Sequence, residues 1–161
     1  FEKVTLVVSH DFKIINSVEL ALPNEADGSF KTYMDYLTIT SPTSKQYALQ
    51  QLAETNELGF RVLDGKLMVA MGSFYTTRVG DEFRITLDSG KVFDVIIGDL
   101  KQDIHTDENN QYIPKNGNIV EFIIDQTVMD ETILEAGSIS KAGFKGSIIK
   151  IEKLVSKGSL V

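Results

Sequence analysis

Short apolar runs that alternate with polar residues recur along most of the chain and predict a mainly β protein. The clearest runs are FRVL, LMVAM, EFRITL, VFDVII, IVEFII at 119–124 and SIIKIEKLV at 147–155. The residues LDSG at 87–90 separate two of these runs, and Asp, Ser and Gly are residues that turns favour. EFRITL and VFDVII are therefore expected to pair as a hairpin.

The first part of the chain shows the same alternation. VTLVV at 4–8 and a period of two that extends to Leu22 predict an N-terminal β-hairpin that closes near NEADG at 24–28. A further strand is expected over FKTYMDYLTIT at 30–40. Residues 1–28 are interpreted either as an N-terminal β-hairpin or as the end of an upstream domain. Residues 29–161 are assigned to one β-barrel domain.

Helical signals are few. Ser44 or Thr43 is a suitable N-cap before KQYALQQLAET, so a short helix is expected at about 44–54. A second helical turn is expected near 127–136. Many short strands with one or two short helices favour a small closed β-barrel, since closure removes exposed strand edges.

Composition narrows the classes of partner and site. The net charge of −7 disfavours nucleic acid, whose phosphates need Lys and Arg. No apolar run is long enough to cross a bilayer, so membrane insertion is not expected. The chain has no cysteine, which excludes disulfides and thiolate chemistry. The lack of thiols favours an exported, extracellular protein, and a start at Phe1 favours a mature or excised fragment.

A dense polar cluster follows the buried runs of residues 66–107. Asp99, Lys101, Asp103, His105 and Asp107 are expected at one edge of the sheet. Carboxylates beside a histidine suit proton transfer, because neighbouring charges separate their pKa values. Residues 101–118 have almost no apolar periodicity and predict a long loop, which in a compact domain is usually functional.

Several segments together resemble a known family. FKTYMDY, SPTSKQYALQ, VAMGSFY, VGDEFRITLDSGKVFDVIIGDLK and NIVEFIID resemble proteins of Gram-positive bacteria and their prophages. Their core is similar to the six-stranded double-psi β-barrel of lytic transglycosylases and 3D-domain proteins. The resemblance covers roughly residues 30–155 and implies a small closed six-stranded barrel, located in the cell wall or on a virion.

The resemblance also implies a catalytic residue. Asp99, at the end of VIIGD, is in the place of the family's acid/base, which cleaves glycan strands. The family's Gly-rich signature DTGGAIKG is replaced here by DLKQDIHTD. The candidates for a catalytic partner of Asp99 are therefore Asp103, His105 or Asp107. Asp35 is a further candidate for the same cleft. The alternatives are that Asp99 caps nearby backbone N–H groups and that His105 is a surface residue.

Ligand-binding candidates come from the aromatic and loop residues. Most aromatic side chains on strands pack inward, and Tyr36, Tyr47 or Tyr75 is expected to be exposed for stacking on sugar rings. Lys101 and Asp107 are candidates for polar contacts with the same ligand.

No metal or cofactor is expected. A calcium loop starting at Asp103 needs Gly and Glu where the chain has Glu108 and Pro114. Three functions therefore remain open: a barrel that cleaves peptidoglycan glycan through Asp99, a non-catalytic binding domain, and a structural domain of a phage tail or a secretion or conjugation apparatus that contacts neighbouring protein subunits.

Overall fold

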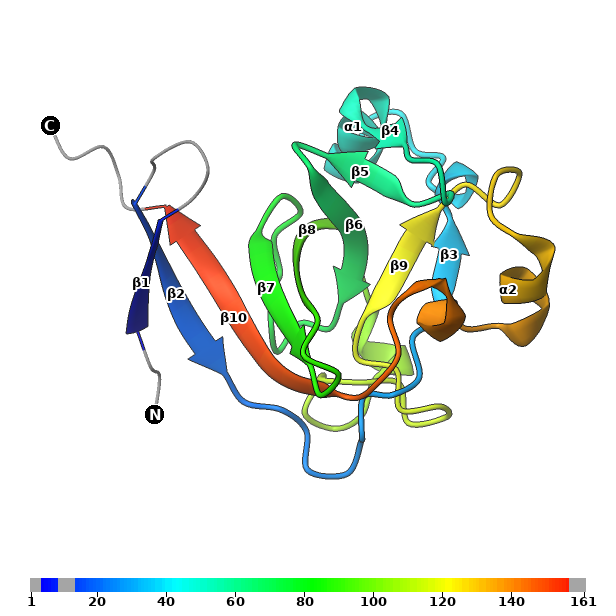
Figure 1. Ribbon diagram of the computed structural model, residues 1–161. Coiled ribbons are helices and arrows are strands. Elements are labelled where there is room, and N and C mark those ends of the chain that lie inside the picture. The colour runs from blue at the N-terminus through cyan, green and yellow to red at the C-terminus, as the bar shows by residue number, and fades with distance from the viewer. Residues whose placement is uncertain (1–3, 9–13, 157–161) are drawn as a thin grey trace, which may run out of the picture.

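A computed structural model describes residues 4–8 and 14–156 and shows one strongly curved mixed β-sheet (Figure 1). The prediction of a mainly β protein is confirmed. Its strands are β1 (Val4–Val8), β2 (Ile14–Leu20), β3 (Tyr33–Asp35), β4 (Glu54–Thr55), β5 (Arg61–Leu63), β6 (Lys66–Met71), β7 (Glu82–Leu87), β8 (Val92–Leu100), β9 (Glu121–Ile124) and β10 (Ile148–Ser156).

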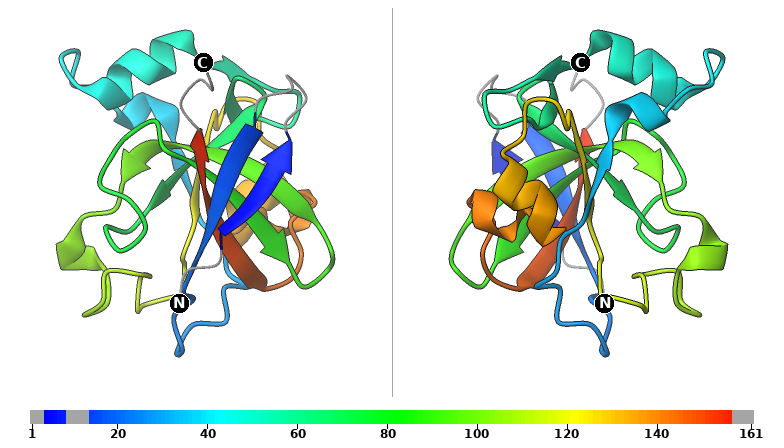
Figure 2. Two further views of the ribbon diagram at one scale, coloured as in Figure 1. Left: turned by 90° about the vertical axis from the view of Figure 1, so that its left-hand side faces the viewer. Right: turned by 90° about the vertical axis from the view of Figure 1, so that its right-hand side faces the viewer.

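Two α-helices and three short 3-10 helices lie around the sheet. Helix α1 (Lys45–Leu52) begins at Ser44, whose hydroxyl accepts a hydrogen bond from the Tyr47 N–H, as the N-cap prediction requires. Helix α2 is Glu131–Ala136, and the 3-10 helices are η1 (Tyr36–Thr38), η2 (Asp103–His105) and η3 (Ile139–Ala142). Figure 2 shows α2 on one side of the sheet and the β1–β2 hairpin on the other.

The strands follow the order β1-β2-β10-β7-β8-β6-β5-β4. Strand β6 is the branch point, since it pairs in parallel with β8 along one edge and divides its other edge between β5 and β9. Strand β3 then pairs in parallel with β9. The β7–β8 pair is the antiparallel hairpin that the LDSG turn predicts.

The prediction of a closed six-stranded double-psi barrel is wrong. The described strands form a single open sheet, in which β1 and β4 are two separate ends of the strand order and no ladder joins them. The physical reason is the branch at β6. Because β5 and β9 share one edge of this strand, the sheet divides there instead of continuing around to its first strand.

The prediction of one strand over residues 30–40 is also wrong, because the observed strand is much shorter. Strand β3 stops at Asp35, where the Thr38 hydroxyl donates to the Asp35 carbonyl oxygen at 2.7 Å and the chain turns into η1. The N-terminal hairpin is present, since β1 and β2 pair antiparallel. Strand β2 also pairs with β10, so the hairpin belongs to the same sheet as the rest.

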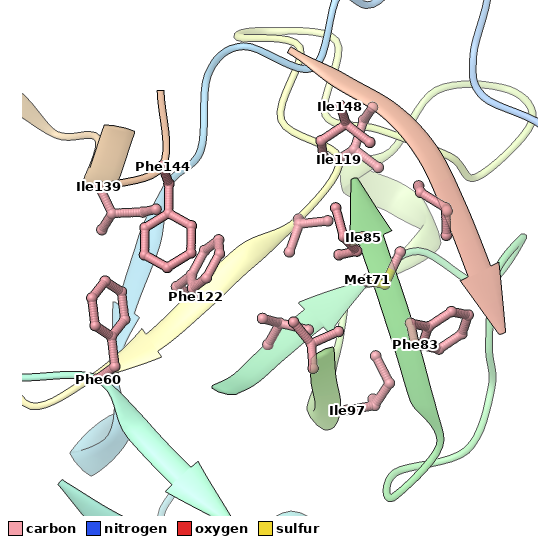
Figure 3. Packing of buried hydrophobic residues seen from close by; sticks show 14 of the residues in the cluster. Phe60, Met71, Phe83, Ile85, Ile97, Ile119, Phe122, Ile139, Phe144 and Ile148 are labelled. Atoms are coloured by element: carbon pink, nitrogen blue, oxygen red, sulfur yellow. The ribbon is translucent and has the colours of Figure 1, made fainter. Parts of the chain in front are cut away.

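Phenylalanine rings fill the core on one face of the sheet (Figure 3). The Phe122 ring lies 5.6 Å from Phe60 and 5.1 Å from Phe144, measured between ring centroids. Such tilted and edge-on contacts suit the charge distribution of aromatic rings. Ile139 of η3 is buried beside them, so the chain from η3 to β10 closes this part of the core.

A second, smaller cluster lies on the opposite face of β6, β8 and β9. It contains Met68, Ile96 and Ile123, and η1 and α1 pack against it through Tyr36 and Leu49. Strand β6 is thus buried on both faces, which explains its continuous apolar run.

We expect Phe122→Ala to lower the free energy of unfolding by about 3–5 kcal/mol, because it leaves a cavity among the core rings. Phe74 is 44% exposed, so Phe74→Ala is the matched control, with an expected loss below about 1 kcal/mol. Urea denaturation followed by circular dichroism measures both. Equal losses for the two variants would contradict the assigned core.

Candidate binding cleft

Three loops meet at one end of the sheet. Strands β6 and β8 are parallel and end there, and β9 is antiparallel to β6 and starts there. Strand β3 is parallel to β9, so it starts at the same end. The segments 21–32, 72–81 and 101–120 therefore gather at one end of a buried sheet, a place where loops commonly form ligand sites.

These loops enclose an open cleft of about 630 Å³, a volume within the usual range for small-ligand sites. One wall is the segment 21–25, the other is 107–114, and Phe74 lies between them. The lining residues are Ala21, Leu22, Pro23, Asn24, Glu25, Phe74, Asp107, Glu108, Asn109, Gln111, Tyr112 and Pro114.

Hydrogen bonds fix both walls to the loop that carries Phe74. The buried Tyr75 hydroxyl donates to the carbonyl oxygen of Ala21 at 2.9 Å, which attaches the first wall. The Phe74 N–H donates to the carbonyl oxygen of Asn110 at 3.1 Å, which attaches the second. Gly72 allows this approach, since a Cβ at that position would collide with the same Asn110 carbonyl.

Asp107 organises the second wall. One carboxylate oxygen accepts the N–H groups of Gln111 at 2.7 Å and Tyr112 at 3.0 Å, and the other accepts the N–H of Asn109 at 3.2 Å. Burial would raise the pKa of Asp107, but these backbone hydrogen bonds outweigh it and lower the pKa. The predicted ligand residue Asp107 therefore lines the cleft, where its carboxylate also shapes the loop.

The cleft combines exposed aromatic surface with negative charge. Phe74 is the more exposed ring, and Tyr112 is half-buried opposite the first wall. Glu25, from the first wall, lies close enough to Tyr112 to act on its phenol electrostatically. Burial first, and then the charges of Glu25 and Asp107, raise the pKa of Tyr112.

Asp99 lies near the end of β8, half-buried, opposite Ala70 of β6. Its carboxylate accepts the N–H of the next residue, Leu100, at 2.9 Å. This contact is the capping role that the sequence left open as an alternative to acid/base catalysis. Asp99 is not among the residues that line the cleft.

The other two catalytic candidates lie apart from Asp99. Asp35 is opposite Ile124 at one end of β9, and it accepts the N–H of Gln126 at 2.9 Å. Asp99 lies opposite Ala70 of β6, and Ala70 also pairs with Glu121 at the other end of β9. His105 is exposed on η2. The structure therefore does not gather these three side chains into one site.

The expectation that Tyr75 is exposed is wrong, because its side chain is 3% exposed and burial raises its pKa. Tyr36 and Tyr47 are half-buried around η1 and α1. The Arg61 guanidinium lies 4.1 Å from the Tyr36 ring centroid, so this ring already has a cationic partner. Neither tyrosine lines the cleft.

Lys101 follows β8, and its N–H donates to the Met71 carbonyl oxygen at 3.0 Å. Burial lowers the pKa of the Lys101 ammonium to about 8, and the charge of Glu121 opposes that shift. Glu121 accepts a hydrogen bond from the Thr32 hydroxyl at 2.9 Å. Lys101 thus belongs to a polar group beside β9, outside the cleft lining.

Sequence reasoning missed most of the cleft. From the sequence, Glu25 is expected in the turn at 24–28, aromatic rings such as Phe74 are expected mainly in the core, and no pattern marks Glu108 or Tyr112 as ligand residues. The available signal was the length and polarity of the 101–118 loop, which did indicate a functional segment. Nothing in the sequence indicated that segment 21–25 faces it.

Other site classes receive no support from the described part of the chain. Within it, no group of three or more His, Cys, Asp or Glu side chains is arranged to hold a metal ion. No helix there has the length and apolar character needed to cross a membrane. No protein-family model, curated protein or solved structure matches the chain.

We expect Asp107→Asn to lower the free energy of unfolding by about 1–2 kcal/mol at pH 7, because charge-assisted hydrogen bonds are lost. Folding lowers the pKa of Asp107, so its carboxylate stabilises the protein above the unfolded value of about 3.9. This stabilisation is lost as the pH falls through the lower, folded value. The difference between wild type and variant, measured by urea denaturation from pH 7 to pH 2.5, is therefore expected to shrink below about pH 4. A difference that stays constant with pH would contradict the charged role of Asp107.

Proposed function

We propose that this protein is a binding domain of the bacterial cell envelope or of a phage particle, and that it binds a glycan in the cleft between segments 21–25 and 107–114. The observation that carries this proposal is the pairing of the Phe74 and Tyr112 rings with amide and carboxylate groups in one open cleft. Aromatic rings offer flat apolar surface, and sugar rings have apolar C–H faces that pack on such surfaces.

The polar lining fits sugar hydroxyl groups. Asn24 and Asn109 are exposed and carry amides, each with both donor and acceptor atoms. Carboxylates accept further hydrogen bonds from hydroxyl groups. Pro23 and Pro114 add rigid apolar surface, so the site needs little ordering when a ligand binds.

Binding is favoured over glycan cleavage because of where the carboxylates lie. Asp99 caps the Leu100 N–H and lies outside the cleft lining, and Asp35 is at the opposite end of β9. Glycan cleavage by general acid/base chemistry needs an acid held next to the scissile bond. Within the cleft, Asp107 accepts three backbone hydrogen bonds, which favours its ionised form and opposes proton donation.

The cell-envelope setting rests on the resemblance of residues 30–155 to Gram-positive and prophage proteins that act on peptidoglycan. That resemblance concerns the sequence segments and not the closed barrel, which the open sheet excludes. Peptidoglycan is accordingly the first glycan to test.

We expect the purified protein to pellet with insoluble Gram-positive peptidoglycan, and Phe74→Ala or Tyr112→Ala to weaken this binding at least about tenfold, or ~1.4 kcal/mol. Tyr47→Ala is the matched control, since Tyr47 is a half-buried tyrosine outside the cleft. The bound fraction at increasing peptidoglycan concentration gives the affinity, and mass spectrometry of the supernatant detects released fragments. Pelleting that is unchanged in both cleft variants, or anhydro-muropeptides that disappear with Asp99→Asn, would contradict the proposal.

Assembly with neighbouring protein subunits is a second candidate function, favoured by the outer edge of β1. Among the described residues β1 pairs only with β2, so one edge of its backbone is left without a strand partner. Such edges pair readily with a strand of another chain. Concentration-dependent self-association in sedimentation velocity is the expected result, and a monomer at all concentrations would exclude pairing between copies.

A further inference from the structure

We infer that the sugar bound in the cleft carries a free amine, as a peptidoglycan glucosamine unit without its N-acetyl group does, so that the ligand class is a cationic amino sugar and not a neutral or acidic one. This inference rests on the proposed glycan-binding function and specifies its ligand. It follows from the charge of the cleft, from the carboxylate oxygens that remain available and from the position of the two rings.

The cleft carries one sign of charge. Glu25, Asp107 and Glu108 line it, and among the residues that the structure describes no Lys or Arg does. The three carboxylates come from both walls, so a ligand between the walls lies in the negative potential of both. Anionic sugars are repelled there, and an ammonium group is attracted.

Two of the carboxylates have room for a ligand. The Asp107 oxygens already accept three backbone N–H groups, so this residue mainly supplies charge. Glu25 and Glu108 are exposed. Glu25 lies near Tyr112, and a carboxylate has acceptor capacity for more than one donor.

The electrostatic effect on Tyr112 agrees with the positions of these carboxylates around the cleft. After burial, the nearby charges of Glu25 and Asp107 raise the pKa of its phenol, and Glu108 contributes in the same direction. All three carboxylates therefore lie near Tyr112, with Glu25 on the first wall and Asp107 and Glu108 on the second. An ammonium group in that space would interact favourably with all of them.

The aromatic rings suit the same cation. Phe74 is exposed in the cleft, and its ring makes an edge-to-face contact with Tyr75, at 5.0 Å between centroids. An ammonium group near the faces of Phe74 and Tyr112 gains a cation–π attraction. An N-acetylated sugar would present a neutral amide there, and Glu25 and Glu108 would lose their charged partner.

The test compares three β-1,4-linked tetrasaccharides of equal length, made of glucosamine, N-acetylglucosamine or glucose. Isothermal titration at pH 6 and low salt measures their affinities. We expect the glucosamine tetramer to bind at least tenfold more tightly than the other two. We also expect 0.5 M NaCl to remove most of that difference, because salt screens exposed charges.

Two cleft variants and one control locate the effect. Glu25→Gln and Glu108→Gln are each expected to weaken glucosamine binding at least threefold and to weaken N-acetylglucosamine binding by a smaller factor. Glu135→Gln is the control, since Glu135 is an exposed carboxylate on α2, outside the cleft. It is expected to change neither affinity.

The outcomes separate the two proposals. N-acetylglucosamine or glucose tetramers that bind as tightly as glucosamine, and lose affinity with Phe74→Ala, would overturn the amino-sugar inference and leave glycan binding standing. An equal loss of glucosamine affinity in Glu135→Gln would also overturn it, because the attraction would then come from net charge alone. If no tetramer and no peptidoglycan binds, the proposed function fails, and the inference fails with it.

Discussion

The ammonium group of Lys31 is fully buried, and it donates hydrogen bonds to the carbonyl oxygens of Ser29 at 3.0 Å and Gly146 at 2.6 Å. Burial lowers its pKa, and a buried charge is tolerated only where its donors are satisfied. The Lys31 carbonyl oxygen also accepts the N–H of Ile139. One residue thus holds the chain before β3 against the segment that closes the phenylalanine core, and the first wall of the cleft is part of that chain.

The cleft is held in place by contacts of this kind, between segments far apart in the sequence. Tyr75 attaches the wall at Ala21, and Asp107 folds the other wall around its own carboxylate. The loop that holds both walls follows β6, a strand that is buried on both faces, which limits the movement of this loop. A preorganised site of this kind needs little ordering on binding, so weak individual contacts with a sugar can add to a useful affinity.

Much of the local structure could be predicted from the sequence. The Asp88–Gly90 turn lies between β7 and β8 as expected, Ser44 caps α1, and the last strand, β10, is where SIIKIEKLV indicated. These features depend on neighbours in the chain. Barrel closure failed as a prediction because it depends on which strand edges meet, and the apolar run of β6 does not reveal that two strands share one of its edges.

The sequence alone determined most of the strands, the overall negative charge and the presence of a long polar loop that includes Asp107, because periodicity and composition are local properties. Only the tertiary structure decided that Glu25 and Tyr112 face each other and that Asp99 and Asp35 lie at opposite ends of β9. The tertiary structure also decided the register shift at Gly98, which sets Asp99 opposite Ala70. Pairing between distant strands fixes such distances, and a single sequence carries no direct record of that pairing.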